Sequence, residues 1–169
     1  MGLFKEDYNR YKEELGFVLH EPSIIIVFIY RLRKYLYRRN KTRFLRLPFC
    51  ILVEPLYFFF TLFFGIQLPK SSSIGPGLMI HHFGGIILNS NTVIGKNCTL
   101  RHNVTIGNKS EIDDVPVIGD NVSIGCGAVI IGRIKIGNNV TIGANAVVLK
   151  DVPDNSIAVG NPARIIPQK

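Results

Sequence analysis

Hydrophobic residues between Ile118 and Pro153 recur with a period of six. An aliphatic residue opens each hexad, and a second small or aliphatic residue follows four places later. The opening positions are Ile118, Ile124, Ile130, Ile136, Ile142 and Val148, and the second positions are Val122, Ala128, Ile134, Val140, Ala146 and Val152. The period fits neither an amphipathic helix, with about 3.6 residues per turn, nor the alternation of a half-buried strand. It predicts a parallel β-helix, in which short strands stack about 4.8 Å apart and the opening residues form an aliphatic ladder inside.

The ladder continues toward the N-terminus with two interruptions. The first is a slip of two residues between His81 and Leu88, and it separates the ladder Ile74, Ile80, Ile86 from the ladder Leu88, Ile94, Leu100, Ile106. The second is the stretch 107–117, GNKSEIDDVPV, which is polar and acidic and has no hexad pattern. We therefore expect a β-helix over residues 74–169, with an extruded loop at 107–117 and a C-terminal cap.

Residues 1–73 lack the hexad pattern and are predicted to form a helical N-terminal region. Residues 3–15 and Ser23–Tyr37 have helical character, and the second of these stretches has an apolar face. The run from Phe49 to Ile66, FCILVEPLYFFFTLFFGI, is apolar enough to suggest a membrane span. However, Glu54 and Pro55 stand near its middle and its length is at the short end of the spanning range, so we expect it not to span.

The positive charge of the chain is concentrated in this N-terminal region. The formal net charge is +8, and residues 1–73 hold twelve basic and six acidic side chains, against eight and six in residues 74–169. The basic run 31–46 directly precedes the apolar segment and has two interpretations. It is either a solvated helix face, or part of a peripheral membrane contact through residues 31–66, with cations facing anionic lipid and aromatic rings at the headgroups. No nucleic-acid-binding motif accompanies the charge, so a nucleic-acid partner is not expected.

The cysteines and the first residues bear on the compartment. Cys50, Cys98 and Cys126 are few and widely spaced without a CxxC motif, which argues against a disulfide framework and against a thiolate zinc site. The first twenty residues are charged and mixed, unlike a signal peptide. These features predict a cytoplasmic location. Peripheral attachment to the inner face of a membrane is compatible with it.

Three of the four histidines, His81, His82 and His102, lie in the first predicted coils. Histidine titrates near neutral pH and is suited to act as a general base that removes a proton from a hydroxyl group. His81 and His82 are adjacent, so on one strand they would point to opposite faces and could not serve the same substrate. The HxxxxH pair of β-helical zinc enzymes is absent, and no metal is expected.

The hexads, the block MIHHFGGIILNSNTVIGKNCTLRHNVTIGN and the ending AVVLKDVPDNSIAVGNPARII carry a resemblance to a known family. Over residues 74–166 the chain resembles the hexapeptide-repeat acyltransferases of the serine acetyltransferase-like group. It looks most like the small O-acetyltransferases of colanic acid and capsule-type surface-polysaccharide clusters. The resemblance implies a left-handed β-helix with triangular coils, a homotrimer with sites between neighbouring subunits, and acetyl-CoA as co-substrate without a metal.

The resemblance also implies roles for individual residues. His82, in the block IHHFGG where serine acetyltransferases carry Leu-Asp-His-Ala-Thr-Gly, matches the catalytic base. The candidate acceptor-binding positions are His81, Arg101, His102, Asp114 and Gln67, with contact to the coenzyme as the alternative for Arg101 and His102. The positions that would contact the coenzyme are Gly107, Asn108, Cys126 and Ala144 along the pantetheine, with Lys150 and Arg164 as cations for the phosphates.

Departures from the serine acetyltransferase pattern change the expected acceptor. The carboxylate that pairs with the catalytic histidine there aligns with Gln67, the preceding aspartate aligns with His81, and an Arg-His pair aligns with Asp114 and Val115. Free serine would lose partners for its charged ends, and burying an unpaired charge is costly. We therefore expect a sugar hydroxyl of a bacterial surface polysaccharide or its precursor as acceptor, and Gln67, Glu54 or a loop aspartate of another subunit as the group that orients His82. Serine acetylation in cysteine biosynthesis and a non-catalytic β-helix scaffold remain the alternatives.

Overall fold

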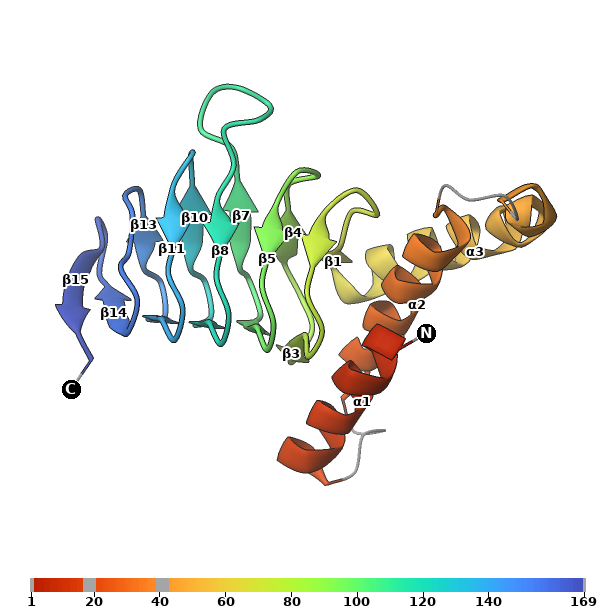
Figure 1. Ribbon diagram of the computed structural model, residues 1–169, viewed down its shortest axis with the longest axis horizontal. Helices are drawn as coiled ribbons and strands as arrows, with labels where there is room; N and C mark the ends of the chain where they lie inside the picture. The colour runs from red at the N-terminus through yellow and green to blue at the C-terminus, as the bar shows by residue number, and fades with distance from the viewer. Residues whose placement is uncertain (1, 17–20, 39–42, 169) are drawn as a thin grey trace.

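The computed structural model describes residues 2–16, 21–38 and 43–168, with three helices followed by a tapering stack of short strands (Figure 1). The helices are α1 (Gly2–Leu15), α2 (Ser23–Leu36) and α3 (Arg43–Phe64). They confirm the helical prediction for the N-terminal region. His20, the fourth histidine, lies outside the described residues, as do residues 39–42 of the predicted basic run.

The strands form the three flat sides of a left-handed parallel β-helix, as predicted. The first side, sheet A, contains β1 (Ile66–Gln67), β4 (Ile86–Leu88), β7 (Thr105–Gly107), β10 (Val129–Ile131) and β13 (Val147–Val148). Sheet B contains β2 (Ser73–Ile74), β5 (Val93–Ile94), β8 (Val117–Ile118) and β11 (Lys135–Ile136). Sheet C contains β3 (Met79–His81), β6 (Thr99–Arg101), β9 (Ser123–Ile124), β12 (Thr141–Ile142), β14 (Ser156–Val159) and the antiparallel β15 (Arg164–Pro167).

The hexad pattern places its residues as expected. All six opening positions from Ile118 to Val148 are buried in one continuous hydrophobic core. Polar corners complete the coils, because Asn97, Asn121, Asn139 and Asn155 all adopt positive φ. The side-chain amides of the first three each donate a hydrogen bond of 3.0 Å to the side-chain oxygen of the next asparagine in this series, and Asn155 accepts the last one. Asparagine tolerates this left-handed backbone, so each corner turns tightly and also pairs with its neighbours.

Two boundaries differ from the sequence-based expectation. The β-helix begins at Ile66, because β1 pairs with β4 in register Ile66↔Ile86, rather than at Ile74. At the other end Val152 bridges Ile136 on sheet B, so it takes an opening position of a shortened hexad instead of a second position. A two-residue strand without a repeat before it gives no periodic signal, which is why the first coil was placed too late.

Both predicted interruptions of the ladder are present. Ile86 and Leu88 are both buried on β4, which absorbs the slip that follows His81. The loop between β7 and β8 projects from the corner where sheet A meets sheet B (Figure 1). Ile106 and Ile118 are therefore consecutive inward positions on neighbouring sides, and the residues between them form an insertion.

The helical region covers the first coil and shares its core. Ile26, Val27 and Tyr30 of α2 belong to the same buried cluster as the β-helix ladder. Arg31 donates to both carboxylate oxygens of Asp7, at 2.8 and 3.0 Å, and to the carbonyl oxygens of Ile74 and Gly75. Since Asp7 is fully buried and also accepts a hydrogen bond from the Leu78 backbone, this ion pair joins α1, α2 and the first coil.

Candidate active site

His82 occupies a widened corner between sheets C and A. Strand β3 ends at His81, and His82 has a φ of +64°, which turns the chain away from the strand. Its side chain is exposed. The expectation that His81 and His82 point to opposite faces was wrong, because strand alternation ends at His81; their ring centroids lie 6.4 Å apart.

His102 lies at the equivalent corner one coil further on. The backbone N–H of Asn103 donates to the carbonyl oxygen of Gly84 at 2.8 Å, which stacks the two corners. The rings of His82 and His102 approach edge to face, with centroids 6.0 Å apart. The Nδ1 atom of His102 is buried and has no hydrogen-bond partner among the described residues. The structure thus brings the three candidate histidines together at one corner.

His81 lies under the helical region, beside two charged residues. It pairs with Arg101 across β3 and β6, and its Nε2 atom is 3.8 Å from Glu14 of α1. Burial, followed by the positive charge of Arg101, lowers the pKa of His81 below its ordinary value. His81 is therefore a neutral imidazole near pH 7 that can accept or donate one hydrogen bond.

Glu14 is a residue of this site that sequence reasoning missed. Its carboxylate accepts a hydrogen bond from Arg10 at 2.9 Å as well as lying near His81. Arg10 in turn donates to Gly77, Cys98 and Thr99, which fixes α1 against sheet C. No repeat or motif links Glu14 to the histidine block, because the contact depends on how α1 docks on the β-helix.

The three groups expected to orient His82 do not do so within one chain. Gln67 is exposed on β1, and no hydrogen bond joins it to His82 in the described structure. Glu54 of α3 is held by Arg33 at 2.9 Å and Lys70 at 3.3 Å. Asp114 stands in the loop between β7 and β8, at the opposite edge of sheet A from His82.

The candidate coenzyme contacts fall on two edges of sheet A. Cys126 and Ala144 continue the corner column of His102, since the N–H of Gly127 donates to His102 O at 3.0 Å and that of Asn145 to Cys126 O at 2.8 Å. Both corners are at least partly exposed. The other edge carries the loop corner, where Gly107 has open space around it and Asn108 accepts a hydrogen bond from Asn89.

The two candidate cations are exposed and lie near the C-terminal end. Lys150 follows β13 at the same edge as Gly107, and Arg164 opens β15 opposite Val159. Among the described residues no group of three or more His, Cys, Asp or Glu side chains is arranged to hold a metal ion. The polar groups that the described site presents are the imidazoles, the corner backbone and these cations.

Comparisons with known proteins agree with this arrangement. Residues 116–150 match the model of the bacterial transferase hexapeptide family (six repeats). The chain is 44% identical over 105 residues to serine acetyltransferase 1, chloroplastic, of Arabidopsis thaliana, covering 61% of this chain and 33% of that protein. It is 40% identical over 104 residues to the putative colanic acid biosynthesis acetyltransferase WcaB of Escherichia coli K12, covering 61% of this chain and 64% of WcaB.

Solved structures extend the likeness to the helical region. The soybean serine acetyltransferase apoenzyme superimposes with a TM-score of 0.79 and 31% identity, covering 98% of this chain and 68% of that one. A serine acetyltransferase in complex with CoA gives a TM-score of 0.81 and 29% identity, covering 98% and 68%. The chain spans only about a third of the length of the Arabidopsis thaliana serine acetyltransferase that it matches, 33%.

A histidine-bearing corner on a hexad β-helix defines a class of protein, the hexapeptide-repeat transferases. Within this class the chain belongs to the serine acetyltransferase-like group, which includes WcaB among the relatives it matches.

Proposed function

We propose that this protein transfers an acetyl group from acetyl-CoA to a hydroxyl group, with His82 as the general base. The observation that carries the proposal is the exposed imidazole of His82 at a corner that continues into the small corners of Cys126 and Ala144. A thin, extended thiol such as pantetheine fits a column of small residues, because no side chain blocks its approach. The likeness to a serine acetyltransferase complexed with CoA supports the same donor.

The proposed step needs one base and no covalent enzyme intermediate. His82 accepts the proton of the acceptor hydroxyl as its oxygen attacks the thioester carbonyl carbon. The tetrahedral intermediate then collapses, the carbon–sulfur bond breaks, and the imidazolium returns the proton to the leaving thiolate. The products are an acetyl ester and free CoA thiol, and the base is regenerated.

A sugar hydroxyl of a surface polysaccharide or its lipid-linked precursor is the proposed acceptor. The imidazoles of His81 and His102 lie beside His82, with ring centroids 6.4 and 6.0 Å from its own, and imidazoles hydrogen-bond neutral hydroxyls well. The charge of Glu14, the carboxylate beside His81, is already offset by Arg10. The match to WcaB supports the same acceptor class.

Free serine is the second candidate, and one contact favours it. Glu14 and Arg101 both lie beside His81, so an ammonium and a carboxylate would each meet an opposite charge there. The matches to serine acetyltransferases support this alternative to a similar degree. Only an acceptor assay separates the two candidates.

A homotrimer with sites between subunits is part of the proposal. Within one chain the candidate contacts lie on two separate edges of sheet A. If the edge carrying His82 faces the loop edge of a neighbour, the two sets converge and the neighbour's Asp114 reaches the histidine corner. Mass measurement of the intact assembly tests this arrangement.

The decisive experiment measures thiol release from acetyl-CoA with the full chain, free serine and a panel of sugars and oligosaccharides. His82→Ala is expected to lower the acceptor-dependent rate by about 10²–10⁴-fold. Lys96→Ala, at an exposed corner away from the histidines, is the matched control and is expected to retain the rate. Serine turnover would favour the second candidate. An unchanged rate in His82→Ala would overturn the base assignment, and no thiol release with any acceptor would favour a non-catalytic scaffold.

A further inference from the structure

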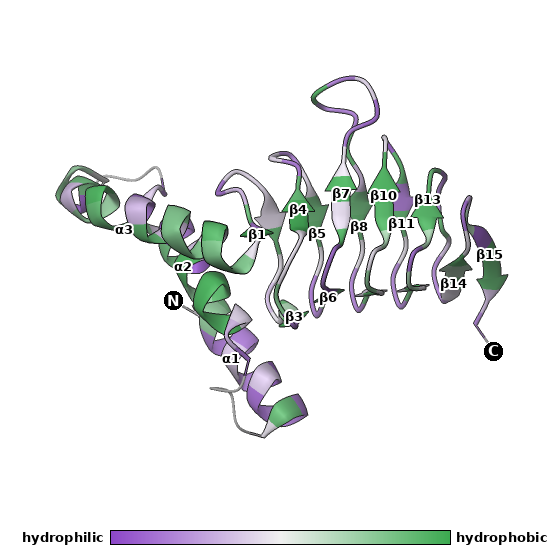
Figure 2. Ribbon diagram, turned by 180° about the vertical axis from the view of Figure 1, so that it is seen from behind, coloured by the Kyte–Doolittle hydropathy of each residue, from purple (hydrophilic) through white to green (hydrophobic). Residues whose placement is uncertain are grey.

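Helix α3 presents a wide apolar surface to solvent. Among the described residues it is the one helix long and apolar enough to cross a membrane. Phe44 is 80% exposed, Ile51 74% and Phe63 69%. The same outer face carries Leu45, Leu47, Phe49, Leu52, Leu56, Phe58, Phe59 and Leu62, all exposed. Figure 2 shows the helix as a green, hydrophobic arm beyond the β-helix. Exposed apolar surface of this extent is uncommon on monomeric soluble proteins and marks an interaction site.

The inner side of α3 is fixed to the rest of the protein along its length. Cys50 and Val53 are buried against Ile29 and Leu36 of α2, and Phe64 joins the β-helix core. Near mid-helix Glu54 forms ion pairs with Arg33 and Lys70. If α3 crossed a bilayer, it would carry α2, with its buried arginines, into the hydrocarbon. Because charged groups there are costly, the packing favours a helix lying in the plane of the interface.

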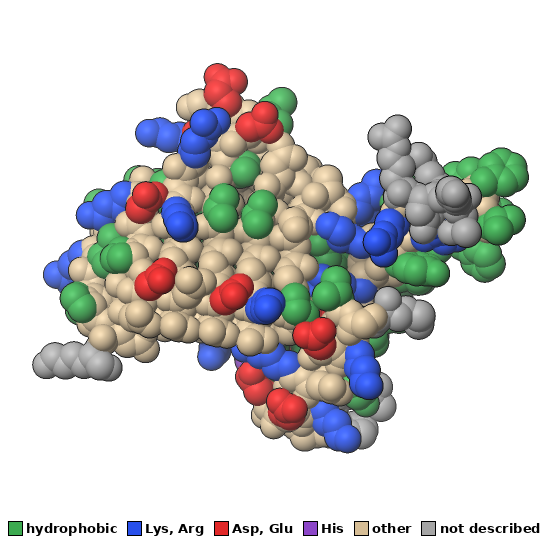
Figure 3. Space-filling model, viewed as in Figure 1, with side chains coloured by type: hydrophobic (Ala, Val, Ile, Leu, Met, Phe, Trp, Pro, Cys, Tyr) green, Lys and Arg blue, Asp and Glu red, His purple; other side chains and the backbone are tan. Residues whose placement is uncertain are grey.

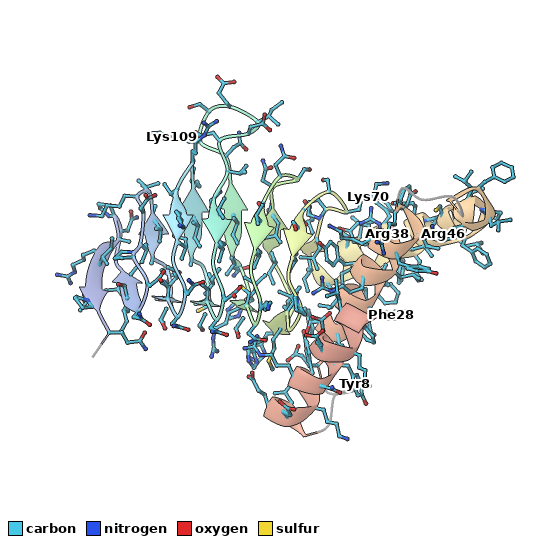
Figure 4. The ribbon with its side chains drawn as sticks, in the orientation of Figure 1. Tyr8, Phe28, Arg38, Arg46, Lys70 and Lys109 are labelled. Atoms are coloured by element: carbon cyan, nitrogen blue, oxygen red, sulfur yellow. The ribbon has the colours of Figure 1, made fainter. Side chains whose placement is uncertain are left out.

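Cations gather beside this apolar face. A cavity of about 740 Å³ lies between α1, α2 and the start of sheet B. Its charged lining comprises the cations Arg31, Lys34, Arg38 and Lys70 and one carboxylate, Glu6. Arg38 is exposed and makes no ion pair in the described structure. Figure 4 shows Arg38, Arg46 and Lys70 along the same border of α2 and α3, and Figure 3 shows the blue cations next to the green end of α3.

We propose that this surface binds an anionic membrane, with the outer face of α3 lying in the plane of the bilayer and the cation-lined cavity facing phosphate-bearing headgroups. The exposed phenylalanines enter the boundary between headgroups and acyl chains, where aromatic and aliphatic groups are favoured. The cations add attraction to anionic lipid that salt weakens. This proposal stands on α3 and its neighbours alone and does not depend on acetyl transfer.

A second copy of the chain is the competing occupant of this face. Residues 1–73 carry twelve basic and six acidic side chains, so two copies meeting through α3 would bring two positive regions together. An anionic bilayer offsets that charge instead. Charge complementarity therefore favours the membrane over self-association.

The test is sedimentation of the full chain with vesicles of neutral phosphatidylcholine or of phosphatidylcholine with about a third phosphatidylglycerol. We expect the chain to bind the anionic vesicles, and to bind the neutral vesicles at least about tenfold more weakly. High salt is expected to weaken binding to the anionic vesicles. The variant Ile51→Asp/Phe63→Asp is expected to lose binding. Ile112→Asp, an equally exposed residue (76%) in the loop, is the matched control and is expected to bind normally. Arg38→Gln is expected to weaken binding to anionic vesicles selectively.

Three results would overturn the proposal. Equal sedimentation of the chain and the α3 variant would show that the face does not contact lipid. A halved molecular mass of the α3 variant, with no vesicle binding by the parent, would mean that a second copy covers the face. Retention in the membrane after alkaline carbonate washing would mean that α3 spans the bilayer. Circular dichroism melting of each variant establishes that a lost signal is not lost folding.

Discussion

The imidazole rings of His82 and His102 approach edge to face, with centroids 6.0 Å apart and planes inclined by 61°. Two different corner geometries produce this contact. His82 lies in the widened corner created by the register slip, and His102 lies in the regular corner of the next coil. The register slip therefore directs the side chain of His82 outward, next to the corner of the following coil, which carries His102.

The buried Nδ1 atom of His102 predicts opposite effects on stability and activity. An unsatisfied buried polar atom costs about 1–3 kcal/mol, so His102→Leu is expected to raise the unfolding free energy or leave it unchanged. The same change removes a polar group beside His82 and is expected to lower kcat/KM by about tenfold or more. Urea unfolding and thiol-release kinetics on the same preparation measure both. Parallel losses of stability and activity would mean that His102 is a structural residue whose Nδ1 atom is satisfied in the assembled protein.

Cys126 offers a chemical probe of the proposed coenzyme column. It is partly exposed, whereas Cys50 and Cys98 are buried, and burial raises the pKa of Cys98 to about 12. Iodoacetamide is therefore expected to modify Cys126 in the native chain, because thiolate character and access control the rate. Saturating CoA is expected to slow this modification about tenfold or more, and peptide mass spectrometry identifies the labelled residue. Labelling at Cys126 that ignores CoA would remove this corner from the coenzyme site, and Cys126→Ser provides the control for labelling elsewhere.

The sequence-based predictions succeeded where the signal is local and periodic. The ladder from Ile118 to Val148, the slip after His81 and the loop at 107–117 all follow from residues within one or two hexads of each other. Predictions failed where one strand of two residues starts the β-helix, as at Ile66, and where a corner replaces strand geometry, as at His82. Glu14 was missed because its approach to His81 depends on the docking of α1, which no local pattern encodes. The roles assigned to Gln67, Asp114 and the coenzyme positions stay predictions.

His81 is expected to make folding sensitive to mild acid. Burial and the charge of Arg101 lower its pKa in the folded state, so the unfolded chain binds more protons as the pH falls through the ordinary histidine range. Stability is therefore present above the unfolded pKa and is lost as the pH decreases. The parent is expected to lose more thermal stability than His81→Gln between about pH 8 and about pH 5.5. Arg101→Gln is the companion variant, and removal of its charge is expected to reduce the acid loss. An identical pH profile for the parent and His81→Gln would contradict the assignment.

The buried ion pair of Asp7 and Arg31 is expected to be the polar interaction that contributes most to holding the helical region on the β-helix. Asp7 is fully buried, and Arg31 is 7% exposed and also bonds two carbonyl oxygens of the first coil. Asp7→Ala leaves a buried guanidinium without its counter-charge and is expected to cost about 3–5 kcal/mol of unfolding free energy.

Removing both partners should be milder than the sum of the single changes. Asp7→Leu/Arg31→Met replaces the charges with apolar groups and leaves no buried charge unpaired, so its cost is expected to fall well below the two single losses added together. Urea unfolding followed by circular dichroism measures each member of the cycle. Additive costs would show that the two side chains act independently. Glu14→Gln, which removes the carboxylate of a more exposed ion pair on the same helix and leaves Arg10 in place, is the control expected to cost less than about 1 kcal/mol. If Glu14→Gln proved as costly as Asp7→Ala, the buried pair would not be the main polar contact that holds the helical region on the β-helix.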